Sequence, residues 1–340
     1  MNEEEKTYKL FYYWLVTSLI LVFIIIIVGG LTRLTNSGLS ITEWEILKGI
    51  IPPLNNETWI MYFDLYKKIP QYNLLNFNMT IDEFKFIFYW EYFHRILARI
   101  IGLFFLLPLI FFYFTKKINR HHLKICCIIL FLIISQGIFG WYMVKSGLID
   151  DITVSHYRLS LHLSTAFIII STIFWLIMNI ISKKNKSFFM IKNENFIFQF
   201  FIIIIFAQII MGAFVSGLDA GKIYQTWPLM GNDYFPNDLN LKNTKDIFNF
   251  DNHSLVQFYH RNLAYLIIFY SLGLSFFIFK KKIFKLYIPL FIVIFFLSLQ
   301  IILGILTLIS GLNIYLASAH QITSVLLVFS ALNLYYLFAK

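Results

Sequence analysis

Two histidine–arginine pairs occupy matching settings in the two halves of this 340-residue chain, His94–Arg95 and His260–Arg261. A further histidine follows each pair near the start of a later apolar run, His162 in the first half and His320 in the second. Ionisable groups inside a bilayer are costly and usually serve a function. A repeated set of four imidazoles therefore indicates two bound metal centres, most simply two haems, whose iron takes neutral imidazole as an axial ligand.

Arginines beside these histidines suit the same interpretation. Arg95 and Arg261 directly follow a histidine. Arg99 lies one turn beyond Arg95, and Arg158 lies four residues before His162. A guanidinium group binds carboxylates through a fixed fork of donors, and haem carries two propionates. The alternative is that these long side chains only extend to the outer membrane interface.

One acidic residue breaks the symmetry between the halves. Glu91 lies three residues before His94, on the same helical face, whereas the counterpart before His260 is Gln257. A glutamate near a buried haem can carry protons, and a glutamine cannot. The difference favours proton-coupled chemistry in the first half and a structural or electron-transfer haem in the second. The alternative is that Glu91 only pairs with Arg95.

The elements that must position these residues are membrane-spanning helices. The chain is 59% hydrophobic and 14% charged, and runs of about 20 apolar residues are typical of spanning helices. We predict an all-α integral membrane protein with eight transmembrane helices, over residues 11–31, 86–114, 123–145, 156–181, 196–217, 255–279, 284–309 and 314–338.

The formal net charge of +10 reflects topology. Lysines and arginines gather in the connectors after the second, fourth and sixth helices, and the positive-inside rule places these connectors and both termini in the cytoplasm. The connectors 32–85, 146–155, 218–254 and 310–313 then face outward. We expect a multi-pass protein of a bacterial inner membrane and no nucleic-acid partner. The basic residues are Lys116, Lys117, Arg120, Lys124, Lys183, Lys184, Lys186, Lys192, Lys280, Lys281, Lys282 and Lys285.

The four histidines share one depth in this topology. Each falls about six to nine residues into a helix that starts outside, roughly 9–13 Å below the surface. All four are therefore expected in the outer leaflet. His121 and His122 lie in a basic connector and are expected to be solvated, His156 is expected at the surface, and neither His156 nor His253 is assigned a role.

The two halves repeat each other. We predict two tandem, pseudo-symmetric four-helix bundles, 1–182 and 192–340, joined by a cytoplasmic linker, 183–191. Each bundle has an even number of helices, so the copies are parallel and are not an inverted transporter repeat. The matching positions are Gln136 and Gly140 with Gln300 and Gly304, Gly29 and Gly38 with Gly212 and Gly221, and His94–Arg95 with His260–Arg261.

These residues lie in longer stretches that resemble one family over about residues 22–335. The chain resembles the haem A synthase family, in its alphaproteobacterial and mitochondrial form. The stretches are Gly29–Ser40, Pro52–Leu54, Trp90–Arg95, Gly140–Leu148, Tyr157–Leu159, Gly217–Gly221, Thr226–Met230 and Gln257–Arg261. Some members carry a cysteine pair in the first outer loop. Residues 32–85 contain no cysteine, so the chain resembles the loop-cysteine-free type.

The resemblance implies an oxidoreductase that converts the ring D methyl group of haem O to the formyl group of haem A, which terminal oxidases use. It implies that Glu91 is the catalytic carboxylate and that the first bundle holds the substrate haem. It implies haem b as the cofactor of the second bundle. The implied substrate-haem residues are His94, His162 and Arg95, and the implied cofactor residues are His260, His320, Arg261 and Gln257.

Haem O synthase and the assembly of cytochrome c oxidase are candidate partners on the same grounds, and a homo-oligomer stays open. The segments 38–54 and 221–236 are expected to cap the haem sites from outside, against ordinary turn chemistry as the alternative. The alternative function is a two-haem electron-transfer cytochrome of the membrane. Such a protein needs haems on opposite sides of the bilayer, and four histidines in one leaflet weigh against it.

Overall fold

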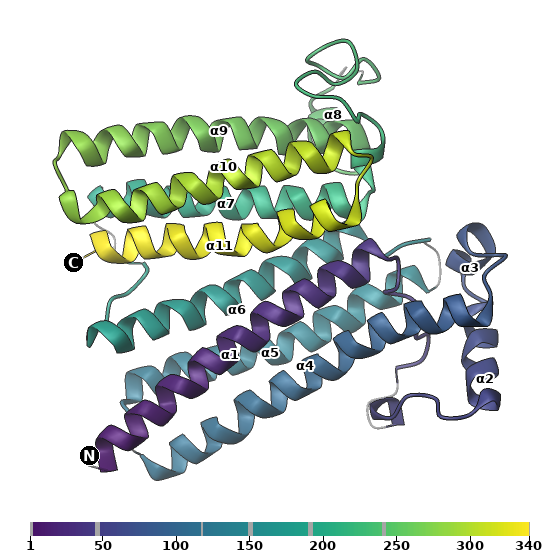
Figure 1. Ribbon diagram of the computed structural model, residues 1–340, viewed down its shortest axis with the longest axis horizontal. Helices are drawn as coiled ribbons and strands as arrows, with labels where there is room; N and C mark the ends of the chain where they lie inside the picture. The colour runs from purple at the N-terminus through teal and green to yellow at the C-terminus, as the bar shows by residue number, and fades with distance from the viewer. Residues whose placement is uncertain are drawn as a thin grey trace. The chain divides into compact units, whose positions relative to one another are not determined.

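The computed structural model describes residues 3–44, 48–116, 118–148, 152–189, 193–239 and 243–339 of the chain. Lys117, Lys192 and the last two residues of the expected linker, 190–191, lie outside these ranges. The described chain divides into two compact units, Met1–Leu176 and Ile177–Lys340, and the division falls inside one long helix, α6. Figure 1 shows both units as arrays of long helices.

Eight helices of the described chain are long and apolar enough to cross a membrane, which confirms the predicted fold class. In the first unit these are α1 (Glu3–Leu34), α4 (Ile81–Thr115), α5 (Arg120–Gly147) and α6 (His156–Ser182). In the second unit they are α7 (Asn193–Gly217), α9 (His253–Lys280), α10 (Tyr287–Ile309) and α11 (Ile314–Phe338).

The helices extend past the predicted apolar runs where polar residues continue the turn. Helix α4 begins at Ile81 because Thr80 and Glu83 form a reciprocal capping box before the apolar stretch. Helix α1 likewise begins at Glu3, well before the predicted start at residue 11. Hydropathy does not register such capped polar turns, so the predicted starts are late.

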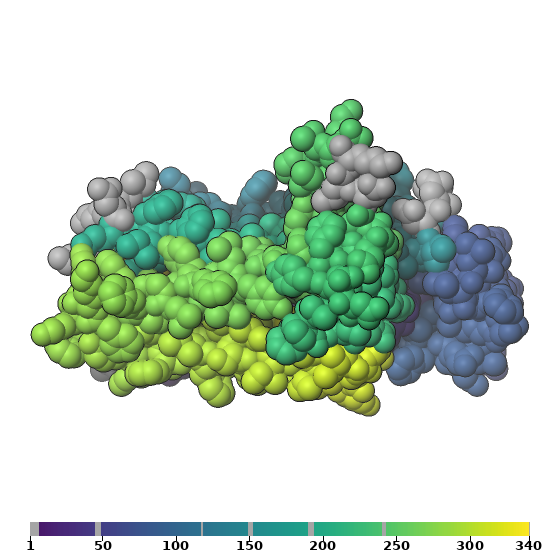
Figure 2. Space-filling view, turned by 90° about the horizontal axis from the view of Figure 1, so that it is seen from above, coloured from purple at the N-terminus to yellow at the C-terminus, as the bar shows by residue number. Residues whose placement is uncertain are grey.

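Packing follows the same pattern in each unit. Helix α1 packs against α4, and α4 against α5; in the second unit α7 packs against α9 and α11, and α10 against α9 and α11. The connector between α7 and α9 contains one short helix, α8 (Thr244–Ile247), and projects beyond the helices of its own unit (Figures 1 and 2).

The connector between α1 and α4 includes two short α-helices that hydropathy did not predict, α2 (Asn56–Tyr66) and α3 (Pro70–Leu75). Their aromatic side chains form a buried cluster with the N-terminal end of α4, and this cluster also encloses Leu39 and Ile41. Phe63 stacks on Phe84 with ring centroids 5.0 Å apart. The cluster therefore fixes the backbone of the segment that follows α1.

Tyr66 is completely buried in this aromatic cluster. Burial raises the pKa of Tyr66 to about 12, because desolvation disfavours the phenolate. The neutral hydroxyl donates to Gln71 Oε1 at 2.9 Å and accepts from Asn76 Nδ2 at 2.7 Å. Tyr66 thus ties α2 to α3.

We predict that Phe63→Ala loosens the connector between α1 and α4 and leaves the spanning helices folded. Removing a buried phenylalanine costs about 3–5 kcal/mol. Limited proteolysis of the detergent-solubilised protein should cut within residues 55–80 much faster than in the unchanged chain. Phe77→Ala is the matched control, because Phe77 is 62% exposed. Equal cleavage rates in the two variants would contradict the packing role.

Candidate functional site

The structure brings the first two predicted histidines next to each other. His94 on α4 and His162 on α6 have ring centroids 6.4 Å apart, with an interplanar angle of 67°. Imidazole–metal bonds of about 2.0–2.1 Å on each side, as measured for zinc, account for most of this separation, and the ring radii fill the remainder. The pair thus has the spacing to ligate one metal ion between the rings, as an iron with two axial imidazoles requires.

The second pair lies in the corresponding helices of the second unit. His260 is on α9 and His320 is on α11, and the two rings lie within electrostatic range of each other. All four side chains are partly exposed. The predicted pairing of the four histidines, two in each unit, therefore matches their placement in the structure.

Each histidine ring rests against a glycine of another helix. An added Cβ would lie 2.9 Å from His94 Cε1 at Gly29, 3.3 Å from His162 Cε1 at Gly140, 3.2 Å from His260 Cε1 at Gly212 and 2.9 Å from His320 Cε1 at Gly304. At Gly29 and Gly304 an added methyl group would force the ring to shift, and at Gly140 and Gly212 it would be tight. The glycines let the backbone of one helix approach the ring from the next.

The buried edges of these rings also carry unused nitrogen atoms. Among the described residues, the Nδ1 atoms of His94, His162 and His260 are buried and have no hydrogen-bond partner. Nitrogen atoms in such a setting normally find a partner. Paired imidazoles, held by close helix contacts and with free ring nitrogens, fit the axial ligand set of haem in both units.

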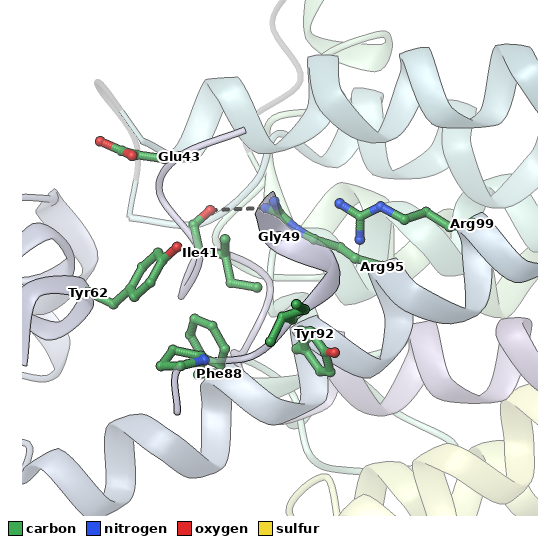
Figure 3. A pocket seen from close by; sticks show the side chains of 10 residues that line it. Ile41, Glu43, Gly49, Tyr62, Phe88, Tyr92, Arg95 and Arg99 are labelled. Atoms are coloured by element: carbon green, nitrogen blue, oxygen red, sulfur yellow. Dashed lines mark hydrogen bonds between the residues drawn. The ribbon is translucent and has the colours of Figure 1, made fainter. Parts of the chain in front are cut away.

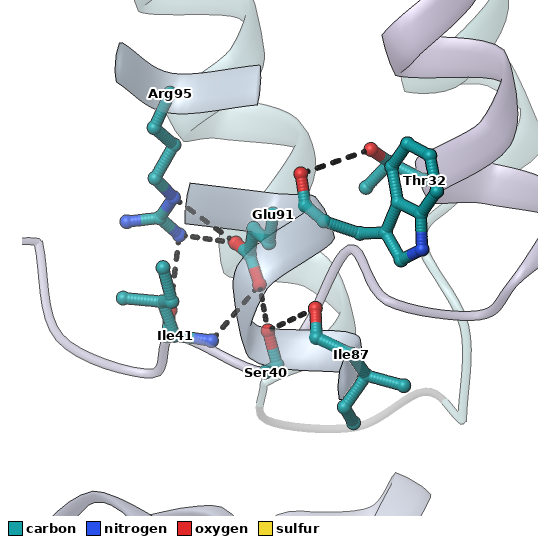
Figure 4. Close-up of polar contacts among 7 residues, drawn as sticks. Thr32, Ser40, Ile41, Ile87, Glu91 and Arg95 are labelled. Atoms are coloured by element: carbon teal, nitrogen blue, oxygen red, sulfur yellow. Dashed lines mark hydrogen bonds and ion pairs between the residues drawn. The ribbon is translucent and has the colours of Figure 1, made fainter. Parts of the chain in front are cut away.

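Glu91 lies at the centre of a buried polar network one turn before His94 (Figure 4). Its Oε2 accepts hydrogen bonds from Ser40 Oγ at 2.7 Å and from the backbone N–H of Ile41 at 2.9 Å. Its Oε1 accepts from Arg95 Nε at 3.0 Å and from Nη2 at 2.5 Å. Glu91 is 3% exposed. The structure thus contains the Glu91–Arg95 pair that the sequence left open as an alternative.

The network closes on the segment after α1. Arg95 Nη2 also donates to the carbonyl of Ile41 at 3.0 Å, and the guanidinium lies 4.9 Å from the ring centre of Trp44. Ser40 Oγ lies 3.3 Å from the carbonyl of Ile87. Because the aromatic cluster holds Ile41 from the other side, the donors to Glu91 are fixed in place.

In the second unit, the residue that matches Glu91 donates a hydrogen bond to the connector instead of accepting one. Gln257 Nε2 donates to the carbonyl of Tyr224 at 2.9 Å, and Arg261 Nη2 donates to the same carbonyl at 3.0 Å. Gln257 Oε1 and Arg261 Nε are buried without a partner among the described residues. Ile223 stands where the first unit has Ser40. This copy therefore fixes its connector without a buried carboxylate.

A small pocket opens beside the Glu91 network (Figure 3). Arg95 and Arg99 line it from α4, together with Tyr92, and Glu43 lines it from the segment after α1. Arg158, the other predicted carboxylate partner, instead donates to the carbonyl of Tyr142 at 2.8 Å. Of the arginines that the sequence suggested as carboxylate partners, Arg95 and Arg99 therefore line the same pocket.

Two of the predicted exposures are wrong. His122 is 3% exposed, because Tyr8 on the unpredicted first turns of α1 reaches it at 3.4 Å and Phe11 stacks on its ring. His156 is also buried, at the first turn of α6, with its ring against Tyr157. Sequence analysis also missed the close contact of the four glycines with the histidine rings, although the recurrence of these glycines in the two halves was visible as a repeat.

We predict that Arg95→Met destabilises the protein more than Arg261→Met. The first change leaves a buried carboxylate without its counter-charge, which costs about 3–5 kcal/mol. The second change removes donors only from backbone carbonyls, at about 1–3 kcal/mol. Thermal unfolding in detergent measures both, and Arg95→Met/Glu91→Gln should recover part of the loss. Equal destabilisation by the two single changes would show that the ion pair adds nothing.

Comparison with known proteins places the chain in a family. Residues 12–332 match the family described as cytochrome oxidase assembly protein, COX15-CtaA. Three relatives carry the name heme A synthase. The protein of Pelagibacter ubique is 48% identical over 93% of both chains. That of Flavobacterium psychrophilum is 39% identical over 96% of this chain and 97% of its own. That of Nitrosomonas eutropha is 41% identical over 94% and 91%. The resemblance inferred from the sequence is confirmed, and the chain belongs to the COX15-CtaA family of cytochrome oxidase assembly proteins.

Proposed function

We propose that the protein is a haem A synthase of a bacterial inner membrane, which oxidises the ring D methyl group of haem O to a formyl group. Haem O is the substrate, held in the first unit by His94 and His162. Haem b is the cofactor, held in the second unit by His260 and His320. The family and the names of its relatives support the reaction. The two histidine pairs, of which only the first has a glutamate three residues before one of its histidines, support the division of labour.

The orientation follows from the charge distribution. The basic connectors favour cytoplasmic termini, and the histidine pairs then face the outer side of the membrane. Release of haem A on that side would suit the assembly of a terminal oxidase, the process named in the family description.

Written with water as the oxygen donor, converting a methyl group to a formyl group replaces two C–H bonds by a C=O bond and releases four protons, and an electron acceptor has to take up the four electrons. Haem b supplies a redox centre when it is bound. The residues of this chain then have to bind the substrate, orient its ring D and accept a proton. Arg95 and Arg99 are suited to hold the propionates, since both border the same pocket.

Glu91 is the group best placed to take up a proton. Three of its four hydrogen bonds come from groups that only donate, the Ile41 N–H and two guanidinium N–H groups. Ser40 differs, because a hydroxyl can also accept. When Oε2 is protonated, it can donate to Ser40 Oγ, and Ser40 can donate to the carbonyl of Ile87, already 3.3 Å away. The network can therefore hold a proton without rearranging its backbone.

The second unit has no equivalent of this exchange, since it combines Gln257 with Ile223. A glutamine amide neither gains nor loses a proton at physiological pH. The contrast between Glu91–Ser40 and Gln257–Ile223 is the observation that carries the assignment of chemistry to the first unit.

We predict that Glu91→Gln gives a folded, haem-loaded protein that makes at least about 100-fold less haem A, since general acid–base groups contribute roughly 10²–10⁴ in rate. Haem extracted from cells with a haem O supply, identified by mass, measures the yield. Glu57→Gln, a change in the exposed first turn of α2, is the control and should give full yield. Normal haem A from Glu91→Gln would remove the carboxylate from the mechanism.

We predict that Gly304→Ala lowers haem b content several-fold, because the new methyl group would lie 2.9 Å from His320 Cε1 and displace the ring. Gly273→Ala is the matched control in the same unit. A Cβ there meets nothing within 4 Å, and alanine favours the helix by about 1 kcal/mol. The low-spin b-type absorption per mole of purified protein is the measurement. Full absorption in Gly304→Ala would show that the glycine does not position the ring.

A further inference from the structure

Three of the four histidines are tied to a glutamine on the helix that carries their glycine. Gln136 Nε2 donates to the backbone carbonyl of His162 at 2.9 Å, and Gln208 Nε2 donates to that of His260 at 3.0 Å. Gln300 contacts the ring of His320 twice. Its side-chain Nε2 lies 3.4 Å from the ring Nε2, and its backbone carbonyl oxygen lies 3.0 Å from the ring Nδ1.

These glutamines share one register. Each lies four residues before the glycine against which the histidine ring rests: Gln136 before Gly140, Gln208 before Gly212, and Gln300 before Gly304. Residues four apart lie on the same face of a helix. Glycine and glutamine therefore form a two-part seat, in which the glycine admits the ring and the glutamine hydrogen-bonds to the histidine.

The seat of His94 lacks the second part. Four residues before Gly29 the chain has Ile25, whose side chain cannot form a hydrogen bond. In the part of the chain that the structure describes, no hydrogen bond from another helix to His94 is found. Farther along α1, Thr32 Oγ1 makes only a long contact with α4, at 3.4 Å from the carbonyl of Trp90. The same hydroxyl already donates to the carbonyl of Val28 at 2.8 Å.

We propose that Ile25 makes His94 the loosely held ligand of the protein, so that the first unit can release its haem while the second unit retains its own. This inference rests on the proposed function, in which the first haem is converted and leaves. A product site needs at least one ligand that can withdraw, whereas a cofactor site needs both ligands fixed. In the second unit both histidines have a glutamine; in the first unit only His162 does.

The size of the effect follows from one hydrogen bond. A net hydrogen bond changes an equilibrium or a release rate roughly fivefold. Ile25→Gln should therefore slow the release of haem O and haem A roughly fivefold and leave haem b unaffected. Gln208→Ile, the reverse exchange at the matching position, should speed the release of haem b by a similar factor. Both changes act beside a histidine without altering it.

The experiment uses the full-length protein in detergent, purified from cells supplied with haem O. Excess apomyoglobin captures released haem, and mass analysis at timed points identifies which haem has been transferred. Ile24→Gln is the control for placing an amide on α1, because Ile24 is 40% exposed and does not belong to the seat. Its release rates should equal those of the unchanged protein. Retained b-type absorption verifies that each variant is folded.

The expected result is slower release of haem O and haem A in Ile25→Gln alone. If Ile25→Gln does not fold, Gln136→Ile tests the same idea in the other direction and should speed release from the first unit. Equal rates in Ile25→Gln and Ile24→Gln, or an unchanged rate in Gln136→Ile, would overturn the inference alone. A protein that never holds haem O or haem A would overturn the proposed function and the substrate role of the first unit together.

Discussion

The contact between a histidine ring and the backbone of a neighbouring helix is the constraint on which both units depend. At each of the four glycines, even one added methyl group would lie within about 3.3 Å of the ring. Such an approach sets the distance between the two helices and the rotation of the imidazole at the same time. Buried ring nitrogens without a hydrogen-bond partner, as in His94, His162 and His260, are costly, and a bound ligand would offset this cost.

Both units share these glycine–histidine contacts, but they differ at a few positions near the histidines. The exchange of Glu91 for Gln257, and of Ser40 for Ile223, converts a network that can accept a proton into one that only holds a connector. Gln208 donates to the backbone carbonyl of His260, and Ile25 at the matching position of the first unit cannot form such a bond. Glu91 and Gln257 each lie three residues before a histidine, and Ser40 donates to Glu91. On the proposed function, such exchanges between repeated bundles are what would let one bundle hold a substrate and the other a cofactor.

The sequence predicted the spanning helices well because the length of an apolar run is set by the membrane and needs no tertiary information. It predicted the four histidines and the Glu91–Gln257 contrast because repeats make such positions comparable. Helix starts were late where capped polar turns precede the apolar run, as at Ile81. The missing turns of α1 also explain why His122 was expected in solvent, since Tyr8 lies in them.

The contacts that give these residues their setting could not be predicted. The donors to Glu91 come from a turn some 50 residues earlier, held by an aromatic cluster whose two short helices leave no apolar run. The pairing of each glycine with a histidine ring needs the register between two helices, which a single sequence does not contain. The Gln208–Gly212 spacing was visible in the sequence, but only the hydrogen bond to His260 shows what it does.

The central claim is that the two histidine pairs hold two different haems. Quantitative haem extraction from His94→Ala and His260→Ala, with mass identification of each haem per mole of chain, tests it most directly. The account predicts that His94→Ala loses haem O and haem A but keeps haem b with its low-spin absorption, and that His260→Ala loses haem b. Equal loss of all haems from both variants would contradict it.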